Sequence, residues 1–107
     1  MEPTTLVRQY YDALDDHEYE ALEEVLSTGF VQHRPDRTFE GRETFVRFMR
    51  DERPNPNTEH ELDAIVDDGD QVAVRGRLIE SGTTLFAFAD FFDLSDGRIV
   101  RLETYSR

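Results

Sequence analysis

The sequence predicts an α+β domain in which helices cover one face of a curled antiparallel sheet. Two observations predict this class. The first half of the chain has apolar residues at helical spacing, whereas the second half alternates apolar and polar residues and is rich in Val, Ile, Phe and Thr. At 107 residues the chain is long enough to bury one core and too short for two. We therefore expect a single domain over residues 1–107.

Two helices are predicted to open the chain. In residues 4–15 the apolar side chains recur at helical spacing, and Pro3 is typical of a helix start. An acidic break at 15–17 separates this segment from a second one that runs to about residue 26, with its apolar side chains on one stripe and its acids outward. Gly29 lies just beyond and is the predicted helix stop.

A short extended segment and a third helix follow. Residues 30–33 are predicted to be extended, the Arg-Pro-Asp at 34–36 turns the chain, and a brief return strand covers 38–39. A third helix is expected over 42–52, because its large apolar residues fall on one stripe and the Pro-Asn-Pro-Asn at 54–57 ends it.

Four strands are predicted in the second half. Each alternates apolar and polar residues, and the breaks between them contain Gly, Asp and Ser, which favour tight turns. Neighbouring strands should therefore pair antiparallel. The predicted strands are residues 59–66, 71–80, 83–94 and 98–106.

The charge balance excludes one class of partner. The chain has 24 acidic residues and 12 basic ones, all of them arginine, and a formal charge of −12. The acids are spread along the chain, which predicts a solvated acidic shell typical of a high-salt cytoplasm; an acidic patch for a basic partner is the alternative. Either surface repels phosphate backbones, so we expect no nucleic-acid partner.

Other classes lack their sequence signals. The chain has no cysteine and no apolar run of membrane-spanning length, and no secretory signal is recognisable at residues 1–9. We therefore expect a cytoplasmic protein without a membrane partner. The three histidines do not share a helix or strand at ligand spacing, and no phosphate-binding glycine loop or Gly-x-Ser-x-Gly motif is present. No metal and no cofactor are expected.

Three short motifs resemble a known family. They are FVQH at 30–33, FEGRE at 39–43 and DGRIV at 96–100. Together with the order of the predicted elements, they resemble the SnoaL-like branch of the nuclear-transport-factor-2-like superfamily, which includes ketosteroid isomerase and limonene epoxide hydrolase. The resemblance covers nearly the whole chain. It implies a cystatin-like, cone-shaped α+β barrel in which the curled sheet and three covering helices enclose a pocket.

Asp90 is the most informative candidate residue, and it lies in the segment LFAFADFFDL at 85–94. Strand alternation puts it on one face with three of the segment's phenylalanines. If this face is dry, desolvation raises the pKa of Asp90, and the neutral carboxyl can donate a hydrogen bond to an oxygen that gains charge. The alternative is a wet Asp90, or one that pairs with Arg75 or Arg77.

The resemblance to ketosteroid isomerase implies two further residues. The tyrosine of its first helix corresponds to Tyr10 and its catalytic base to His33, with Asp90 as the proton donor. Histidine titrates near neutral pH and suits a general base, although a histidine that caps the turn before Pro35 is the alternative. Tyr10 is either a pocket donor or a core residue, and Tyr11 is expected to point elsewhere. Histidine in place of a carboxylate argues against steroid isomerisation, and the lack of tryptophan argues against a polyketide cyclase.

The predicted function is that of a small-molecule-pocket protein. His33, Asp90 and Tyr10 would act on a small apolar carbonyl compound, as in a cofactor-independent isomerase, cyclase or lyase. The alternative is a non-catalytic ligand-binding or dimer-scaffold module of the same fold, favoured if phenylalanines fill the cavity. His60 is expected at the pocket mouth or on the surface. The predicted pocket residues are Phe30, Phe45, Phe48, Met49, His60, Phe86, Phe88 and Phe92.

The opposite face of the strand at 83–94 is apolar as well. Since the helices can cover only one face of the sheet, the second face needs another cover. We expect a second copy of the chain there, in a twofold homodimer, because twofold pairing is the commonest symmetry. The residues concerned are Leu85, Ala87, Ala89 and Phe91, with Ala73 and Ile79 beside them.

Overall fold

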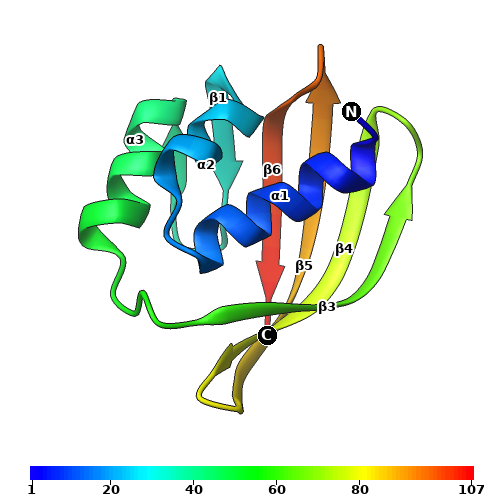
Figure 1. The fold of residues 1–107 in the computed structure, drawn as a ribbon. Coiled ribbons are helices and arrows are strands. Elements are labelled where there is room, and N and C mark those ends of the chain that lie inside the picture. Colours follow the sequence, from blue (N-terminus) through cyan, green and yellow to red (C-terminus); the bar gives the residue numbers. More distant parts are fainter.

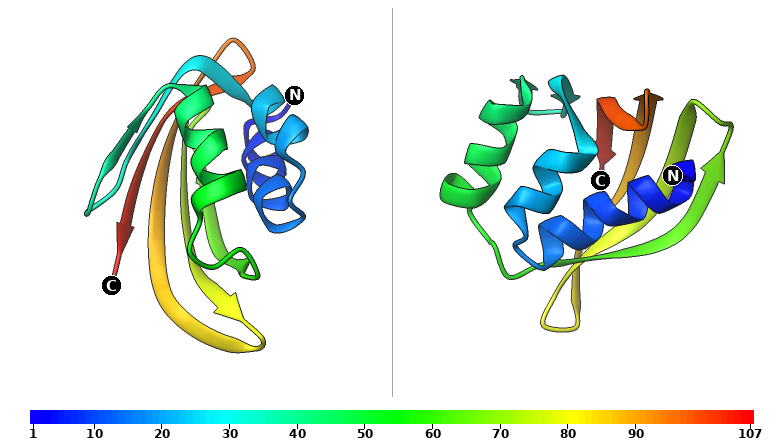
Figure 2. Two further views of the ribbon diagram at one scale, coloured as in Figure 1. Left: turned by 90° about the vertical axis from the view of Figure 1, so that its left-hand side faces the viewer. Right: turned by 45° about the horizontal axis from the view of Figure 1, so that its top comes forward.

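The computed structural model describes residues 1–107 and confirms the predicted α+β class. All three α-helices lie on one face of a curled six-stranded sheet, and the other face carries no helix (Figures 1 and 2). None of the helices combines the length and hydropathy required to cross a bilayer. The elements are α1 (Pro3–Asp15), α2 (Tyr19–Val25), β1 (Leu26–His33), β2 (Thr38–Glu40), α3 (Arg42–Arg47), the π-helical turn η1 (Phe48–Glu52), β3 (Glu59–Asp67), β4 (Gln71–Glu80), β5 (Thr83–Ser95) and β6 (Arg98–Ser106).

Apart from ends shifted by one residue, the observed elements differ from the predicted ones in two places. α2 ends before Leu26, which already has an extended backbone, so Gly29 lies inside β1 and is not the helix stop. The third helix changes after Arg47 into the π-helical turn η1. In that turn the carbonyl of Met49 accepts a hydrogen bond from the hydroxyl of Tyr19 at 3.2 Å, which ties the turn to α2.

The sheet is mixed, whereas the sequence predicted an antiparallel one. Its strand order is β2-β1-β6-β5-β4-β3, and all neighbours are antiparallel except β1 and β6, which run parallel. Parallel pairing needs a long connection between the two strands, and all of the chain from β2 to β5 provides it here. The edge strands β2 and β3 do not pair with each other, so the curled sheet stays open.

Register shifts accompany the curl of the sheet. A shift or bulge bends a strand and increases its twist locally. Figure 2 shows the β4–β5 end of the sheet curving toward the side of the helices, and α1 packs across β3, β4 and β6. In the β3–β6 part of the sheet, the shifts lie between Leu62 and Ala64, between Leu78 and Ile79, and between Asp93 and Leu94.

The core lies between the helices and the inner face of the sheet, and aromatic rings fill much of it. Phe30, Phe45 and Phe92 are fully buried. The ring of Tyr10 stacks on Phe45 with centroids 6.2 Å apart and meets Phe92 edge-on at 5.4 Å. Each such ring contributes about 1.5–3 kcal/mol of burial free energy, so this cluster fixes α1 and α3 against the sheet.

Gly76 on β4 lies where a neighbouring ring and a neighbouring backbone carbonyl come unusually close to the strand. This residue pairs with Phe88 on β5. A Cβ atom at Gly76 would stand 2.5 Å from the carbonyl oxygen of Glu61 and 2.8 Å from Cζ of Phe88. Glycine is therefore required by close approach, and the Phe88 ring lies directly against the backbone of β4.

Candidate functional site

Asp90 is buried at the centre of the sheet, with 5% of its surface exposed. Each of its carboxyl oxygens accepts one hydrogen bond. The hydroxyl of Tyr11 donates to Oδ2 at 2.5 Å, and the hydroxyl of Thr104 donates to Oδ1 at 2.6 Å. Arg75 and Arg77, the alternative partners, point to the other face of the sheet, where Arg77 pairs with Asp63. Asp90 thus has two neutral donors and no ion-pair partner.

Gln32 extends the hydrogen-bond network formed by Tyr11, Asp90 and Thr104. Gln32 on β1 donates from Nε2 to the hydroxyl oxygen of Thr104 at 2.9 Å. The other end of the amide, Oε1, is buried without a hydrogen-bond partner. The chain of contacts from Gln32 through Thr104 and Asp90 to Tyr11 therefore joins β1, β6, β5 and α1.

Burial controls the protonation of this network. Loss of solvent raises the pKa of Asp90, and the hydrogen bonds from Thr104 and Tyr11 and the charges of His60 and Arg34 only partly offset that rise. Burial also raises the pKa of Tyr11 well above its ordinary value, and the charge and hydrogen bond of Asp90 act in the same direction. Tyr11 is consequently a neutral donor throughout the physiological pH range.

A second carboxylate holds His60 at the start of β3. Nδ1 of His60 lies 2.6 Å from Oδ1 of Asp15, at the end of α1, and the backbone N–H of His60 donates to Oδ2 of Asp15 at 2.9 Å. One carboxylate therefore holds both the backbone and the ring of His60. With Nδ1 engaged in this way, Nε2 is the ring atom left for other partners.

The Tyr11–Asp90 pair and the His60–Asp15 pair meet at one cavity between α1 and β3. The rings of Tyr11 and His60 have centroids 5.0 Å apart, and Phe88 contacts both, at 6.0 Å and 5.6 Å respectively. The cavity has a volume of about 290 Å³, and Asp90 lies behind Tyr11 rather than on its wall. Its lining residues are Arg8, Tyr11, Asp12, His60, Glu61 and Leu62.

The structure does not bring His33 to Asp90. In the β1–β6 register His33 lies opposite Glu103, and its Nδ1 is 3.3 Å from the hydroxyl of Thr38 on β2. Both contacts are on the face that carries no helix, so the predicted pairing of His33 with Asp90 is wrong. Strand alternation is the physical reason, because Gln32 and not His33 shares the inner face with Phe30.

Tyr11, and not the predicted Tyr10, lines the cavity and donates to Asp90. Both tyrosines are buried, since the apolar face of α1 is broad. Tyr10 packs among core rings and does not donate to Asp90; burial, reinforced by the charge of Asp90, raises the pKa of its hydroxyl. The expectation that Tyr11 points elsewhere is wrong.

The predicted pocket residues separate into three groups. Phe30, Phe45, Met49 and Phe92 are buried core residues, and none of them lines the cavity beside Tyr11. Phe48 is half-buried, and Phe86 is 37% exposed toward the β4–β5 hairpin, because β5 extends beyond the helices there. His60 lines the cavity and Phe88 packs behind it.

Besides Tyr11, three residues of the site were not predicted. Gln32 is indicated by strand alternation from Phe30, and Thr104 by its place opposite Asp90 in the β5–β6 pair. No local pattern indicates Asp15, which meets His60 only through tertiary packing.

The structure contains no group of three or more His, Cys, Asp or Glu side chains arranged to hold a metal ion.

The open curled sheet with three helices on its inner face is the α+β fold of nuclear-transport-factor-2-like proteins. Within this class, the profile of the SnoaL-like domain matches residues 7–102, and the chain belongs to the SnoaL-like family. No curated protein is significantly similar to it in sequence.

Solved structures support the class. An NTF2-like protein of unknown function from Cytophaga hutchinsonii superposes with a TM-score of 0.85 at 21% identity, covering 100% of this chain and 92% of that one. A ketosteroid isomerase candidate from Kribbella flavida gives 0.86 at 22% identity, with 96% and 76% coverage. A polyketide cyclase candidate from Sinorhizobium meliloti gives 0.81 at 24% identity, with 94% of each chain covered. At these identities the likeness establishes the fold alone.

Proposed function

We propose that the chain binds a small carbonyl compound beside Tyr11 and His60 and catalyses proton transfer on it, as an isomerase, cyclase or lyase without a cofactor. One observation carries this proposal: two hydrogen-bonding side chains share one cavity wall, and each is held from behind by a carboxylate. A base oriented by a carboxylate beside a buried proton donor is a recurring arrangement in acid–base catalysis.

In this proposal His60 is the base. Its Nε2 removes a proton from the carbon next to the carbonyl group; the electron pair of that C–H bond forms a carbon–carbon double bond, and the π pair of the carbonyl group moves onto its oxygen. Asp15 holds the ring and stabilises the imidazolium that forms. Return of the same proton to a different carbon completes an isomerisation.

Tyr11 is the proposed donor to the carbonyl oxygen as it gains charge. Its single hydroxyl proton points to Asp90 in the structure. When Asp90 is protonated, its carboxyl can donate to the oxygen of Tyr11, and the Tyr11 proton is free to turn toward the cavity. The raised pKa of Asp90 favours this state, so Asp90 acts through Tyr11 as a positioning residue.

The size of the cavity limits the ligand. Its volume of about 290 Å³ is at the lower end of the range for small-molecule sites, roughly 300–1,000 Å³. We therefore propose a compact molecule. The hydrophobic contacts come from Leu62 and the ring of Tyr11, whereas Arg8, Asp12 and Glu61 provide polar groups at the cavity rim.

A non-catalytic binding or scaffold module is the second candidate. It is favoured by the aromatic packing of the interior, where Phe30, Phe45 and Phe92 are fully buried and leave the cavity at the α1–β3 edge. In that case the contacts of Asp90 and Asp15 serve to hold α1 on the sheet.

Hydrogen exchange into a panel of small cyclic ketones and enones distinguishes the two candidates. The wild type in D₂O should bind members of the panel, measured by NMR shift changes, and exchange their α-protons. His60→Gln should retain binding and lose exchange. The matched control is His17→Gln, because His17 lies at the α1–α2 turn, where its ring hydrogen-bonds the carbonyl of Pro56 and stacks on the ring of Tyr19.

Binding without exchange would support the second candidate. Exchange that persists in His60→Gln would contradict the assignment of the base. Absence of both binding and exchange across the panel would count against a small-molecule site at this cavity.

We also propose that the acidic surface is an adaptation to a high-salt cytoplasm. A formal charge of −12 destabilises the compact state by self-repulsion, and salt screens that repulsion. The unfolding temperature should therefore rise steadily when KCl is increased from about 0.1 M to about 1 M, over which the Debye length falls from about 10 Å to about 3 Å. A flat or falling unfolding temperature would contradict this proposal.

A further inference from the structure

One arginine lines the cavity beside Tyr11. Arg8 lies on α1, three residues before Tyr11, and residues at this spacing share one side of a helix. Arg8 is the one lining residue whose side chain is always positively charged. The residue is exposed, so it borders the cavity on the side that opens to solvent.

Arg8 has no carboxylate partner within the chain. It takes part in none of the seven ion pairs of the structure. Asp12 lies four residues further along α1, but the two do not pair, and helical pairs in which the cation comes first are the weaker ones. The guanidinium group of Arg8, with its planar fork of N–H donors, is therefore available to a carboxylate of a ligand.

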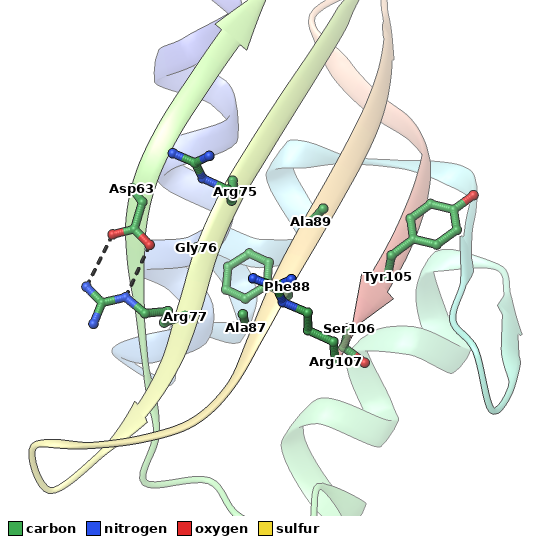
Figure 3. A pocket seen from close by; sticks show the side chains of 10 residues that line it. All are labelled: Asp63, Arg75, Gly76, Arg77, Ala87, Phe88, Ala89, Tyr105, Ser106 and Arg107. Carbon is green, nitrogen blue, oxygen red and sulfur yellow. Dashed lines mark hydrogen bonds and ion pairs between the residues drawn. The ribbon is translucent and has the colours of Figure 1, made fainter.

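Two of the three carboxylates around the cavity already have a partner. Asp15 holds His60. Glu61 pairs with Arg77, which lies on the side of the sheet without helices (Figure 3). Asp12 alone forms no ion pair. The charges free to act on a ligand are thus one guanidinium group and one carboxylate.

We propose that the substrate of this cavity is a keto acid, with its carboxylate bound by Arg8 and its carbonyl oxygen by Tyr11. The proposal rests on the proposed function, because it names the class of carbonyl compound that the cavity takes. A guanidinium group can donate to both oxygens of a carboxylate in parallel. A substrate attached at both ends holds the carbon next to its carbonyl group in one position toward Nε2 of His60.

Helix geometry sets the spacing of the two groups in the substrate. Arg8 and Tyr11 are three residues apart, which is about 4.5 Å along the axis of α1. A γ-keto acid, in which two methylene groups separate the carboxylate from the carbonyl group, spans a similar length. An α-keto acid has the two groups on adjacent carbons and is too short. The cavity volume of about 290 Å³ accommodates a compact γ-keto acid.

The charge of the whole chain makes the local cation decisive. A chain of charge −12 repels an anion at long range. At about 0.15 M salt the Debye length is about 8 Å, so the charges close to the cavity dominate. Arg8 favours an anionic ligand there and Asp12 disfavours it, and the two effects can be removed separately by mutation.

NMR titration of the full chain with a matched pair of ligands tests the proposal. Levulinate is a γ-keto acid, and methyl isoamyl ketone has the same arrangement of heavy atoms with two methyl groups in place of the carboxylate oxygens. The measured quantity is the Kd of the ketone divided by the Kd of the acid, in about 0.15 M KCl. This ratio should fall about fivefold in Arg8→Gln, as the loss of an ion pair at an open cavity mouth predicts.

Three further variants define the role of the charge. Arg8→Lys keeps the charge and should recover part of the ratio. Asp12→Asn removes the neighbouring negative charge and should raise the ratio above that of the wild type. Arg98→Gln is the matched control and should leave the ratio unchanged, because Arg98 is exposed on β6 and does not line the cavity.

An equal ratio in the wild type and in Arg8→Gln would overturn the proposal, and so would a wild type that does not bind levulinate. If α-protons of the ketone exchange in D₂O while the ratio ignores Arg8, the proposed function stands and the keto-acid assignment fails. If levulinate binds through Arg8 without exchange of its α-protons, the keto-acid assignment stands and proton transfer fails.

Discussion

The hydroxyl of Tyr11 donates a hydrogen bond to Oδ2 of Asp90 at 2.5 Å, and this contact joins the first helix to the centre of the sheet. Thr104 donates to the other oxygen of the same carboxyl group. Because each oxygen has one hydroxyl donor, the loss of either hydroxyl leaves a buried oxygen without a partner.

Tyr11→Phe should therefore destabilise the fold by about 1–3 kcal/mol, the cost of leaving a buried polar group unsatisfied. Tyr10→Phe is the matched control, because Tyr10 is equally buried but contributes ring contacts and no hydrogen bond to Asp90. Urea unfolding of both variants measures the difference. Equal losses in the two variants would show that the Tyr11–Asp90 contact contributes nothing specific.

The pH dependence of stability should reveal the titration of Asp90. Burial raises its pKa in the folded chain, whereas an unfolded aspartate has a pKa of about 3.9. The folded state therefore keeps this proton to higher pH than the unfolded state. The contribution is fully present below the unfolded pKa and is lost as pH rises through the folded one.

The control for this titration is Asp90→Asn, which cannot ionise. Measured by urea unfolding from about pH 3 upward, the wild type should lose stability relative to Asp90→Asn as pH rises through the folded pKa. A wild type that instead gains stability relative to the variant over this range would mean that folding lowers the pKa of Asp90.

Thr104 should be needed for its hydroxyl and not for its shape. Thr104→Val removes the donor to Asp90 and the acceptor for Gln32, so the variant should lose about 1–3 kcal/mol of stability. It should also raise the pKa of Asp90 further, because the hydrogen bond from Thr104 lowers it in the wild type. Thr104→Ser keeps the hydroxyl, so it should recover most of the lost stability and bring the pKa of Asp90 back toward its wild-type value. A serine variant as unstable as the valine one would contradict this role.

Gly76→Ala should cost about 1–3 kcal/mol, as overpacking does, because its Cβ would collide with the carbonyl oxygen of Glu61 and the ring of Phe88. Gly29→Ala is the control, since a Cβ there meets nothing within 4 Å. Thermal unfolding should show a large loss for the first variant and little change for the second. A neutral Gly76→Ala would mean that the backbone of β3 at Glu61 and the ring of Phe88 both shift at little cost.

Most of the helices and strands follow from local sequence patterns, whereas the feature that was not predicted is a pairing between distant segments. The strands β4 and β6 have the predicted bounds, because alternation and turn residues are local signals. The parallel pairing of β1 with β6 joins segments about 70 residues apart, and no periodicity within either strand encodes its partner. The sheet was therefore predicted as antiparallel and is mixed.

The site was also predicted only in part, because local patterns place some of its residues and long-range packing decides the others. Strand alternation was sufficient to place Asp90 on the buried face of β5. The same rule, applied from Phe30, selects Gln32 and puts His33 on the other face, whereas the resemblance implied His33. The choice between Tyr10 and Tyr11 depends on the rotation of α1 over the sheet, which packing decides.

The most direct test of the account is a ¹³C NMR titration of the Asp90 carboxyl carbon in the folded chain, with Asp90→Asn used to assign its signal. The account predicts a midpoint above the ordinary aspartate value of about 3.9, because burial disfavours the ionised carboxyl and so favours the neutral form that frees Tyr11 to donate into the cavity. A midpoint at or below that value would contradict it, since burial would then not favour the neutral form of Asp90.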